Sequence, residues 1–150
     1  MENEKTISLL NNLIEINNDR IEGYKTATDE TDESDLKALF TQFKQTSEKC
    51  KSELTSEVHR LGAEPVEGTR VTGKFFRVWM DVKAALTGKD RKAILNSCEY
   101  GEGVAQDNYE DTLKDASTDL SFEQQNMLKS QLEVLRADHN TVKQLSGAIA

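Results

Sequence analysis

Two glutamates, three residues apart, form the most distinctive pair of chemically active side chains in this sequence. They are Glu99 and Glu102, in the stretch SCEYGEGVAQDNY, and Gly101 and Gly103 lie beside them. Residues three apart share one face of a helix, so this pair could form half of a metal site. Each glycine costs a helix interior roughly 1 kcal/mol relative to alanine, so the alternative is a loosened core around a buried charge. The choice depends on which helix face is buried.

The composition predicts one all-α domain spanning residues 1–150. The chain is 36% hydrophobic and 31% charged, which suffices for a single core. It has one proline and few aromatic residues, as is typical of helical proteins. The net charge of -8 is spread without a basic stripe, which argues against DNA, RNA and anionic membranes as partners.

Other features of the composition concern the cellular compartment. No stretch approaches the roughly 20 apolar residues of a membrane span, and the first residues lack the pattern of a signal peptide. Cys50 and Cys98 lie far apart and outside any CxxC motif, so we expect buried, reduced thiols. A cytoplasmic protein without membrane association is predicted.

Four long amphipathic segments carry helical spacing, near residues 4–29, 33–62, 89–117 and 121–147. Gly62 and Pro65 should end the second, and Ser121 with Gln124 fits a capping box that opens the fourth. Short polar joints link the first to the second and the third to the fourth, which predicts two antiparallel hairpins.

The connection between the hairpins, residues 62–89, is long and contains the stretch FFRVWMDVKAAL. Its spacing predicts a short helix that is apolar almost all round, with Trp79 as a packing anchor. Such a crossover lets the second and third helices run parallel. The predicted fold is a four-helix bundle of two antiparallel hairpins with a crossover that carries a short helix.

A helical step of roughly 100° per residue shows which polar side chains face the core. On the third helical segment, Glu102 lies near the centre of the apolar stripe and Glu99 at its edge. Glu22 and Glu53 lie on the flanks of the apolar stripes of the first and second segments. One polar layer is predicted in mid-bundle, formed by Asn17, Thr46, Ser47, Glu102, Asp138 and His139. An inward carboxylate is costly unless it is paired, hydrogen-bonded, protonated or bound to a metal.

Two interpretations of this layer remain open. Di-iron bundles use Glu-x-x-His motifs, and this chain has none. One oxygen-rich site with a single imidazole is still available from Glu22, Glu99, Glu102, Asp138 and His139. Alternatively, the layer is a hydrogen-bonded device that sets the alignment of the helices.

The whole chain resembles the YciF-like group, a bacterial family of ferritin-like four-helix bundles of unknown function. The resemblance is carried by NLIEINNDRIEGY, ELTSEVHRLGAEP, WMDVKAALTGKDRKAIL and CEYGEGVAQDNY. It implies a ferritin-like fold, a cytoplasmic bacterial setting, a stress response and dimers. It also implies that the family's carboxylate positions correspond to Glu22, Glu53, Glu99 and Glu102, with His139 on the last helix.

The expected function is that of a non-catalytic bundle without a cofactor that works through self-association. No phosphate loop, nucleophile motif or Cys-His pair indicates an enzyme. A homodimer or higher homo-oligomer is predicted, with a surface formed by the apolar crossover and by Leu9 and Ile16 of the first helix. The alternative is a degenerate site for iron, manganese or another divalent metal, with ligands from Glu22, Glu53, Glu99, Glu102, Asp138 and His139.

Overall fold

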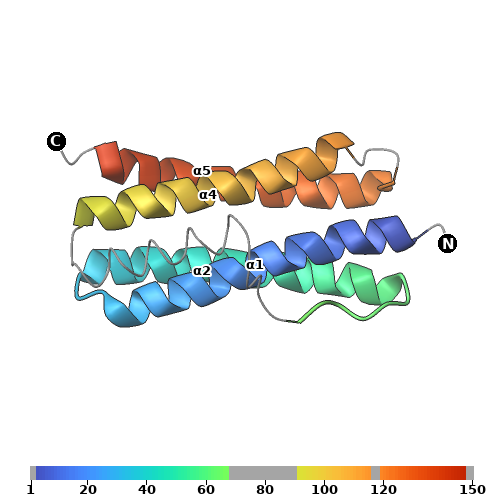
Figure 1. Ribbon diagram of the computed structural model, residues 1–150, viewed down its shortest axis with the longest axis horizontal. Helices are drawn as coiled ribbons and strands as arrows, with labels where there is room; N and C mark the ends of the chain where they lie inside the picture. Colours follow the sequence, from blue (N-terminus) through green and yellow to red (C-terminus); the bar gives the residue numbers. More distant parts are fainter. Residues whose placement is uncertain (1–2, 68–90, 116–118, 148–150) are drawn as a thin grey trace.

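The computed structural model describes residues 3–67, 91–115 and 119–147, and all regular structure in these ranges is helical. The long helices are α1 (Glu4–Glu30), α2 (Ser34–Arg60), α4 (Arg91–Asp115) and α5 (Phe122–Gly147) (Figure 1). The predicted all-α architecture with four long helices is confirmed. The predicted crossover helix with Trp79 lies outside the described residues.

The helices pair as two antiparallel hairpins laid against each other (Figure 1). Backbones approach closely within the pairs α1–α2 and α4–α5, whereas the pairs α1–α4 and α2–α5 touch at few backbone positions. Helices α2 and α4 run in the same direction, as predicted. Because the hairpins meet mainly through side chains, the residues between them decide how they fit together.

Local sequence signals set two of the helix ends as predicted. Gly62 adopts a positive φ of 85° just beyond Leu61, the C-cap residue of α2, and its N–H donates to His59 O at 2.9 Å. This left-handed conformation favours glycine because it lacks a Cβ. At the start of α5, Gln124 N–H donates to Ser121 Oγ at 3.1 Å and Ser121 N–H donates to Gln124 Oε1 at 2.8 Å. The predicted capping box is therefore present.

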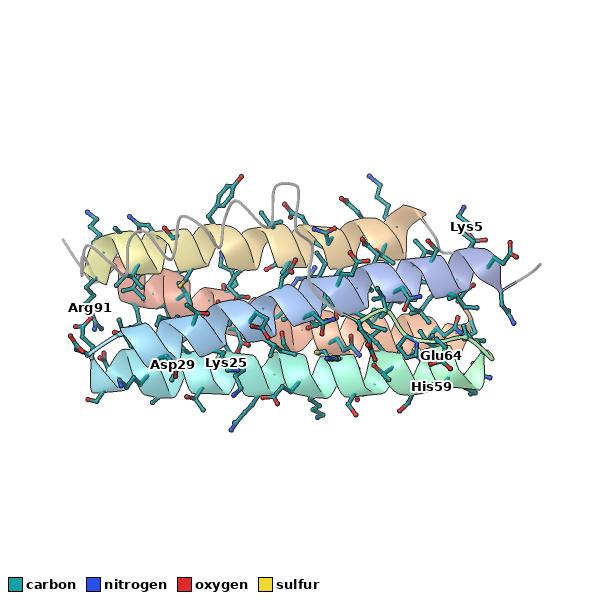
Figure 2. The ribbon with its side chains drawn as sticks, turned by 60° about the horizontal axis from the view of Figure 1, so that its bottom comes forward. Lys5, Lys25, Asp29, His59, Glu64 and Arg91 are labelled. Carbon is teal, nitrogen blue, oxygen red and sulfur yellow. The ribbon has the colours of Figure 1, made fainter. Side chains whose placement is uncertain are left out.

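The apolar core has two halves. One half contains buried leucines from three helices, including Leu13, Leu54 and Leu132, together with Tyr109. The other is built around Phe40, Phe43, Tyr24, Leu95 and Cys98. Polar side chains such as Lys25, Asp29 and His59 lie on the outside (Figure 2). Between the two halves, the helices carry buried polar residues, among them Arg20, Ser47, Glu102 and Asp138.

Ile16 corrects one part of the predicted dimer surface. It is 0% exposed and packs with Ala105 and Val104 of α4, because the α1 face on which it lies is turned toward α4. Leu9 is partly buried against the core. Ile16 therefore contributes to the fold of one chain and is not accessible to a second.

Both cysteines behave as predicted. Cys50 and Cys98 are buried and free. Burial raises the pKa of the Cys50 thiol to about 11 and also raises the pKa of Cys98. Within the described ranges, no helix combines the length and the apolar character needed to cross a membrane.

Candidate functional site

An arginine occupies the centre of the bundle. Arg20 of α1 is 0% exposed, although arginine is rarely fully buried unless it is paired. Its Nη1 donates to Ser47 Oγ of α2 at 2.6 Å, and its Nη2 donates to Glu102 Oε1 of α4 at 2.7 Å. The same Nη2 lies 3.4 Å from Asp138 Oδ2 of α5. One guanidinium thus connects all four described helices.

Aromatic rings support the apolar side of this cluster. The Tyr24 ring lies 5.6 Å from Phe40 and 5.3 Å from Phe43 between centroids, and its hydroxyl donates to Glu102 Oε1. Arg20 Cζ lies 5.4 Å from the centroid of the Tyr24 ring, within the range of a cation–π contact. Arg20 is therefore held by charge on one side and by packing on the other.

Burial and charge shift the pKa values of this cluster in different directions. Burial by itself lowers the pKa of Arg20, but Glu102, Tyr24 and Asp138 together outweigh burial, so the net shift is upward and Arg20 stays protonated. Burial raises the pKa of the Tyr24 hydroxyl well above its usual value. Burial and the neighbouring Glu102 raise the pKa of Asp138 to about 6, although Arg20 acts against them. One positive charge thus faces two carboxylates.

A second polar layer lies next to the first, toward the leucine-rich half of the core. Asn17 Nδ2 donates to Tyr109 Oη at 2.8 Å, and the Tyr109 hydroxyl donates to Gln131 Oε1 at 2.7 Å. Gln131 Nε2 donates to Glu53 Oε1 at 3.0 Å, at the surface of α2. The single predicted polar layer is therefore two layers, because Asn17 lies almost one helical turn from Arg20.

Two of the six predicted metal ligands meet in the core of the bundle. Glu102 and Asp138, which are 1% and 3% exposed, share Arg20. Glu22 and Glu53 are exposed. Glu53 contributes only as the last acceptor of the second layer.

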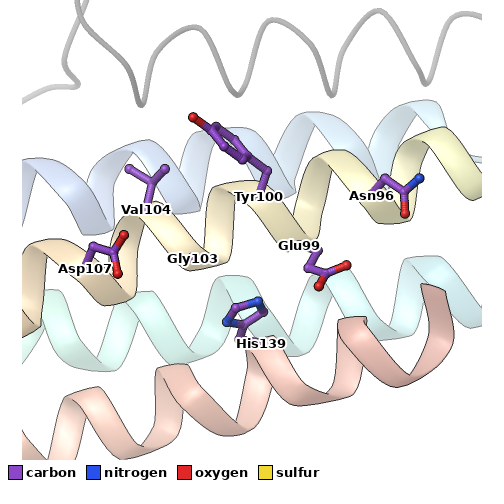
Figure 3. Close-up of a pocket in the computed structure, with 7 residues that line it drawn as sticks. All are labelled: Asn96, Glu99, Tyr100, Gly103, Val104, Asp107 and His139. Atoms are coloured by element: carbon purple, nitrogen blue, oxygen red, sulfur yellow. The ribbon is translucent and has the colours of Figure 1, made fainter. Parts of the chain in front are cut away.

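Glu99 and His139 face an open groove between α4 and α5 (Figure 3). The groove has a volume of about 470 Å³ and is also lined by Asn96, Tyr100, Gly103, Val104 and Asp107. His139 Nδ1 lies 3.1 Å from Gln106 Oε1. A Cβ on Gly103 would lie 3.7 Å from His139 Cε1, so Gly103 faces α5. The predicted difference in position between Glu99 and Glu102 is confirmed, since Glu102 is in the core and Glu99 is only partly buried.

The predicted ligands do not form one cluster in the described part of the chain. Within residues 3–67, 91–115 and 119–147, no group of three or more His, Cys, Asp or Glu side chains is placed to hold a metal. The positive charge between Glu102 and Asp138 is supplied by Arg20. Metal binding by other arrangements of these residues stays a prediction.

Arg20 is the central residue that reasoning from the sequence missed. It follows Asn17 by three residues and precedes Tyr24 by four, which places it on the buried stripe of α1. The metal hypothesis considers inward carboxylates and imidazoles and leaves out this cation on the same buried stripe. The helical spacing of Asn17, Arg20 and Tyr24 was therefore sufficient to predict that Arg20 is buried.

Comparison with known proteins places the chain in a family. No curated protein and no solved structure matches it. The family model described as Domain of unknown function (DUF2383) matches residues 5–115, which include Arg20, Ser47 and Glu102 but precede α5 with Asp138. The chain therefore belongs to the DUF2383 family, a family of unknown function.

Proposed function

We propose that this protein is a non-catalytic helical bundle that works by self-association, with an arginine–carboxylate cluster where a ferritin-like protein would hold metal. The observation that carries the first half of this proposal is the fully buried Arg20, which contacts Glu102 and Asp138. The cluster uses the inward carboxylates to align four helices, so they are not available to a substrate. The predicted stress response and cytoplasmic location are consistent with this role and stay predictions.

The electrostatic balance argues against a divalent ion at these carboxylates. Arginine does not deprotonate in proteins, so its charge is permanent. A divalent ion about 4 Å from that charge would be repelled by about 8 kcal/mol at an effective dielectric of about 20. Metal binding at Glu102 and Asp138 would require Arg20 to leave the core. Arg20 would then also lose its hydrogen bond to Ser47.

Metal titration tests this half of the proposal. Purified wild-type protein without a metal-binding tag is titrated with Fe(II), Mn(II) or Zn(II), and bound metal and thermal unfolding are measured. We expect no specific stabilisation of the wild type. A metal held by the core would stabilise it by about 2.7 kcal/mol when the free ion is a hundredfold above its dissociation constant.

Two substitutions identify the origin of any metal effect. Glu102→Gln and His139→Ala would remove a gain that depends on the predicted ligands. His59→Ala, at an exposed histidine of α2, is the matched control for nonspecific binding. A gain lost in the first two variants and kept in the control would contradict the proposed role of Arg20.

Self-association is supported by the outer face of α4. Tyr100 is 54% exposed and lies one turn from Val104, and both border the groove with Gly103 (Figure 3). A protruding ring beside a groove on the same face suits an isologous contact, in which each copy inserts its ring into the groove of the other. Glu99 and Asp107 line the same groove, so two copies would bring like charges together.

Solution mass tests this contact. We expect a dimer that strengthens as salt screens the carboxylates, and we expect Tyr100→Ser to weaken dimerisation about tenfold or more, as loss of a central aromatic contact does. Phe122→Ser is the control, because Phe122 is 75% exposed on α5 and does not line the groove. A strict monomer at high protein concentration, or equal effects of the two substitutions, would contradict the proposal.

A further inference from the structure

The second polar layer is a chain of hydrogen bonds with one direction. Asn17 donates to Tyr109, Tyr109 donates to Gln131, and Gln131 donates to Glu53. Every donor points away from Asn17 and toward the carboxylate of Glu53 at the surface. Aligned hydrogen bonds of this kind polarise one another, so a donor at the head of the chain would strengthen each later bond.

The head of the chain is a buried acceptor that needs a donor. Asn17 is 0% exposed, and none of the described residues donates to its Oδ1. The orientation of the amide follows from its partners, because Nδ2 also donates to Leu13 O at 2.9 Å. A flipped amide would place its oxygen against that carbonyl oxygen. The acceptor at the head is therefore Oδ1.

Glu102 has a second acceptor in the same condition. Its Oε1 receives hydrogen bonds from Arg20 and Tyr24. Its Oε2 is buried, and within the described part of the chain no donor reaches it. A buried carboxylate oxygen without a hydrogen bond is costly, and buried polar atoms that find no partner in the protein often bind an ordered water.

The helical positions place these two acceptors at neighbouring levels of one interface. On α1, Asn17 precedes Arg20 by three residues, and Arg20 binds Glu102. On α4, Ala105 lies between Glu102 and Tyr109 on the same face, and Tyr109 binds Asn17. Ala105 is 0% exposed and packs with Ile16, and its methyl group is much smaller than the side chains of Glu102 and Tyr109 on either side of it. Space for a small molecule is expected beside it.

We propose that this level holds one water molecule that donates one hydrogen to Asn17 Oδ1 and the other to Glu102 Oε2. Water has two hydrogens to donate, which matches the two acceptors. A bound Mg²⁺ or Ca²⁺ would need six or more oxygen ligands, and Arg20 would repel it. On average one buried water occurs per roughly 27 residues, usually at polar groups that lack a partner. The water joins the Arg20 cluster and the chain to Glu53 into one network.

A crystal structure of the full wild-type chain, at a resolution that shows ordered water, tests the site directly. We expect density for one water within hydrogen-bond distance of both Asn17 Oδ1 and Glu102 Oε2. Absence of that density would overturn the proposal. A direct short contact between the two acceptors, which requires a proton shared between them, would overturn it as well.

A measurement in solution tests the site independently. Magnetic relaxation dispersion of water oxygen counts long-lived internal waters. Ala105→Val should remove one such water, whereas Ala137→Val at an exposed position of α5 should remove none. Equal counts in the wild type and in a folded Ala105→Val variant would contradict the proposal. If that variant does not fold, the density in the wild-type crystal decides.

Discussion

Asp138 should make this bundle more stable at mildly acidic pH than at alkaline pH. Its pKa in the folded chain is raised from 3.8 to about 6, chiefly by burial. The folded state therefore holds this proton more tightly than the unfolded chain does. The contribution to stability is complete below pH 3.8 and is lost as the pH rises through about 6.

The size of the effect follows from the shift. About two pKa units correspond to about 3 kcal/mol, since each unit is worth about 1.4 kcal/mol. Integration over pH gives a gain of about 1.4 kcal/mol between pH 8 and pH 5. Below pH 5 other carboxylates also change the stability. Arginine partners hold the pKa values of Asp35, Glu57 and Glu110 below their usual range, so protonation of these carboxylates at lower pH removes stabilising contacts and opposes the gain from Asp138.

Urea unfolding of the wild type and two variants at pH 5, 6.5 and 8 measures this effect. Asp138→Asn removes the titrating group and should abolish the gain at pH 5. It should also be more stable than the wild type at pH 8, because a neutral amide avoids burial of a second negative charge while Glu102 still pairs with Arg20. Asp111→Asn, at an exposed position of α4, should keep the pH dependence of the wild type. The reasoning is refuted if the wild type is no more stable at pH 5, or if Asp138→Asn keeps the same gain.

Four further variants test other parts of the structure by urea unfolding. Arg20→Met should lower the free energy of unfolding by about 3–5 kcal/mol because it leaves two buried carboxylates without their cation. Arg20→Met combined with Glu102→Leu should recover part of that loss. A loss below about 1 kcal/mol for Arg20→Met alone would contradict the proposed cluster. Gly62→Ala should destabilise by about 1–2 kcal/mol, since φ is 85° and no neighbour within 4 Å adds a packing effect, and no loss would mean that the turn relaxes. Gly103→Ala should stabilise by about 0.5–1 kcal/mol, because the new methyl group makes an ordinary contact with His139 Cε1 at 3.7 Å, and destabilisation would show that α4 and α5 pack more closely there.

The cluster also explains how a bundle with few backbone contacts between its hairpins can keep one alignment. Burial of leucines and phenylalanines is non-directional, so by itself it specifies the relative height of the helices only weakly. A guanidinium that must reach Ser47, Glu102 and Asp138 at once cannot do so without leaving buried charges unpaired. We therefore interpret Arg20 as the residue that sets the relative height of the four helices.

Much of this protein follows from local sequence signals. The spacing of Leu10, Leu13, Phe40 and Leu135 predicts amphipathic helices, because burial repeats with the helical period. Gly62 determines the end of α2, since a left-handed residue after a helix favours glycine. These features depend on neighbours within one or two turns, so they can be read without knowledge of the fold.

The partners of the buried charges were decided by tertiary structure. The sequence by itself placed Glu102 and Asp138 inward, but it did not distinguish a metal from an arginine as the positive charge between them. Arg20 lies 82 residues from Glu102 and 118 from Asp138 in the chain, and only the packing of α1 against the second hairpin brings them together. The same packing buries Ile16 and leaves Glu22 in solvent. Periodicity defines a helix face, whereas the identity of the side chains opposite that face depends on how the helices are placed in space.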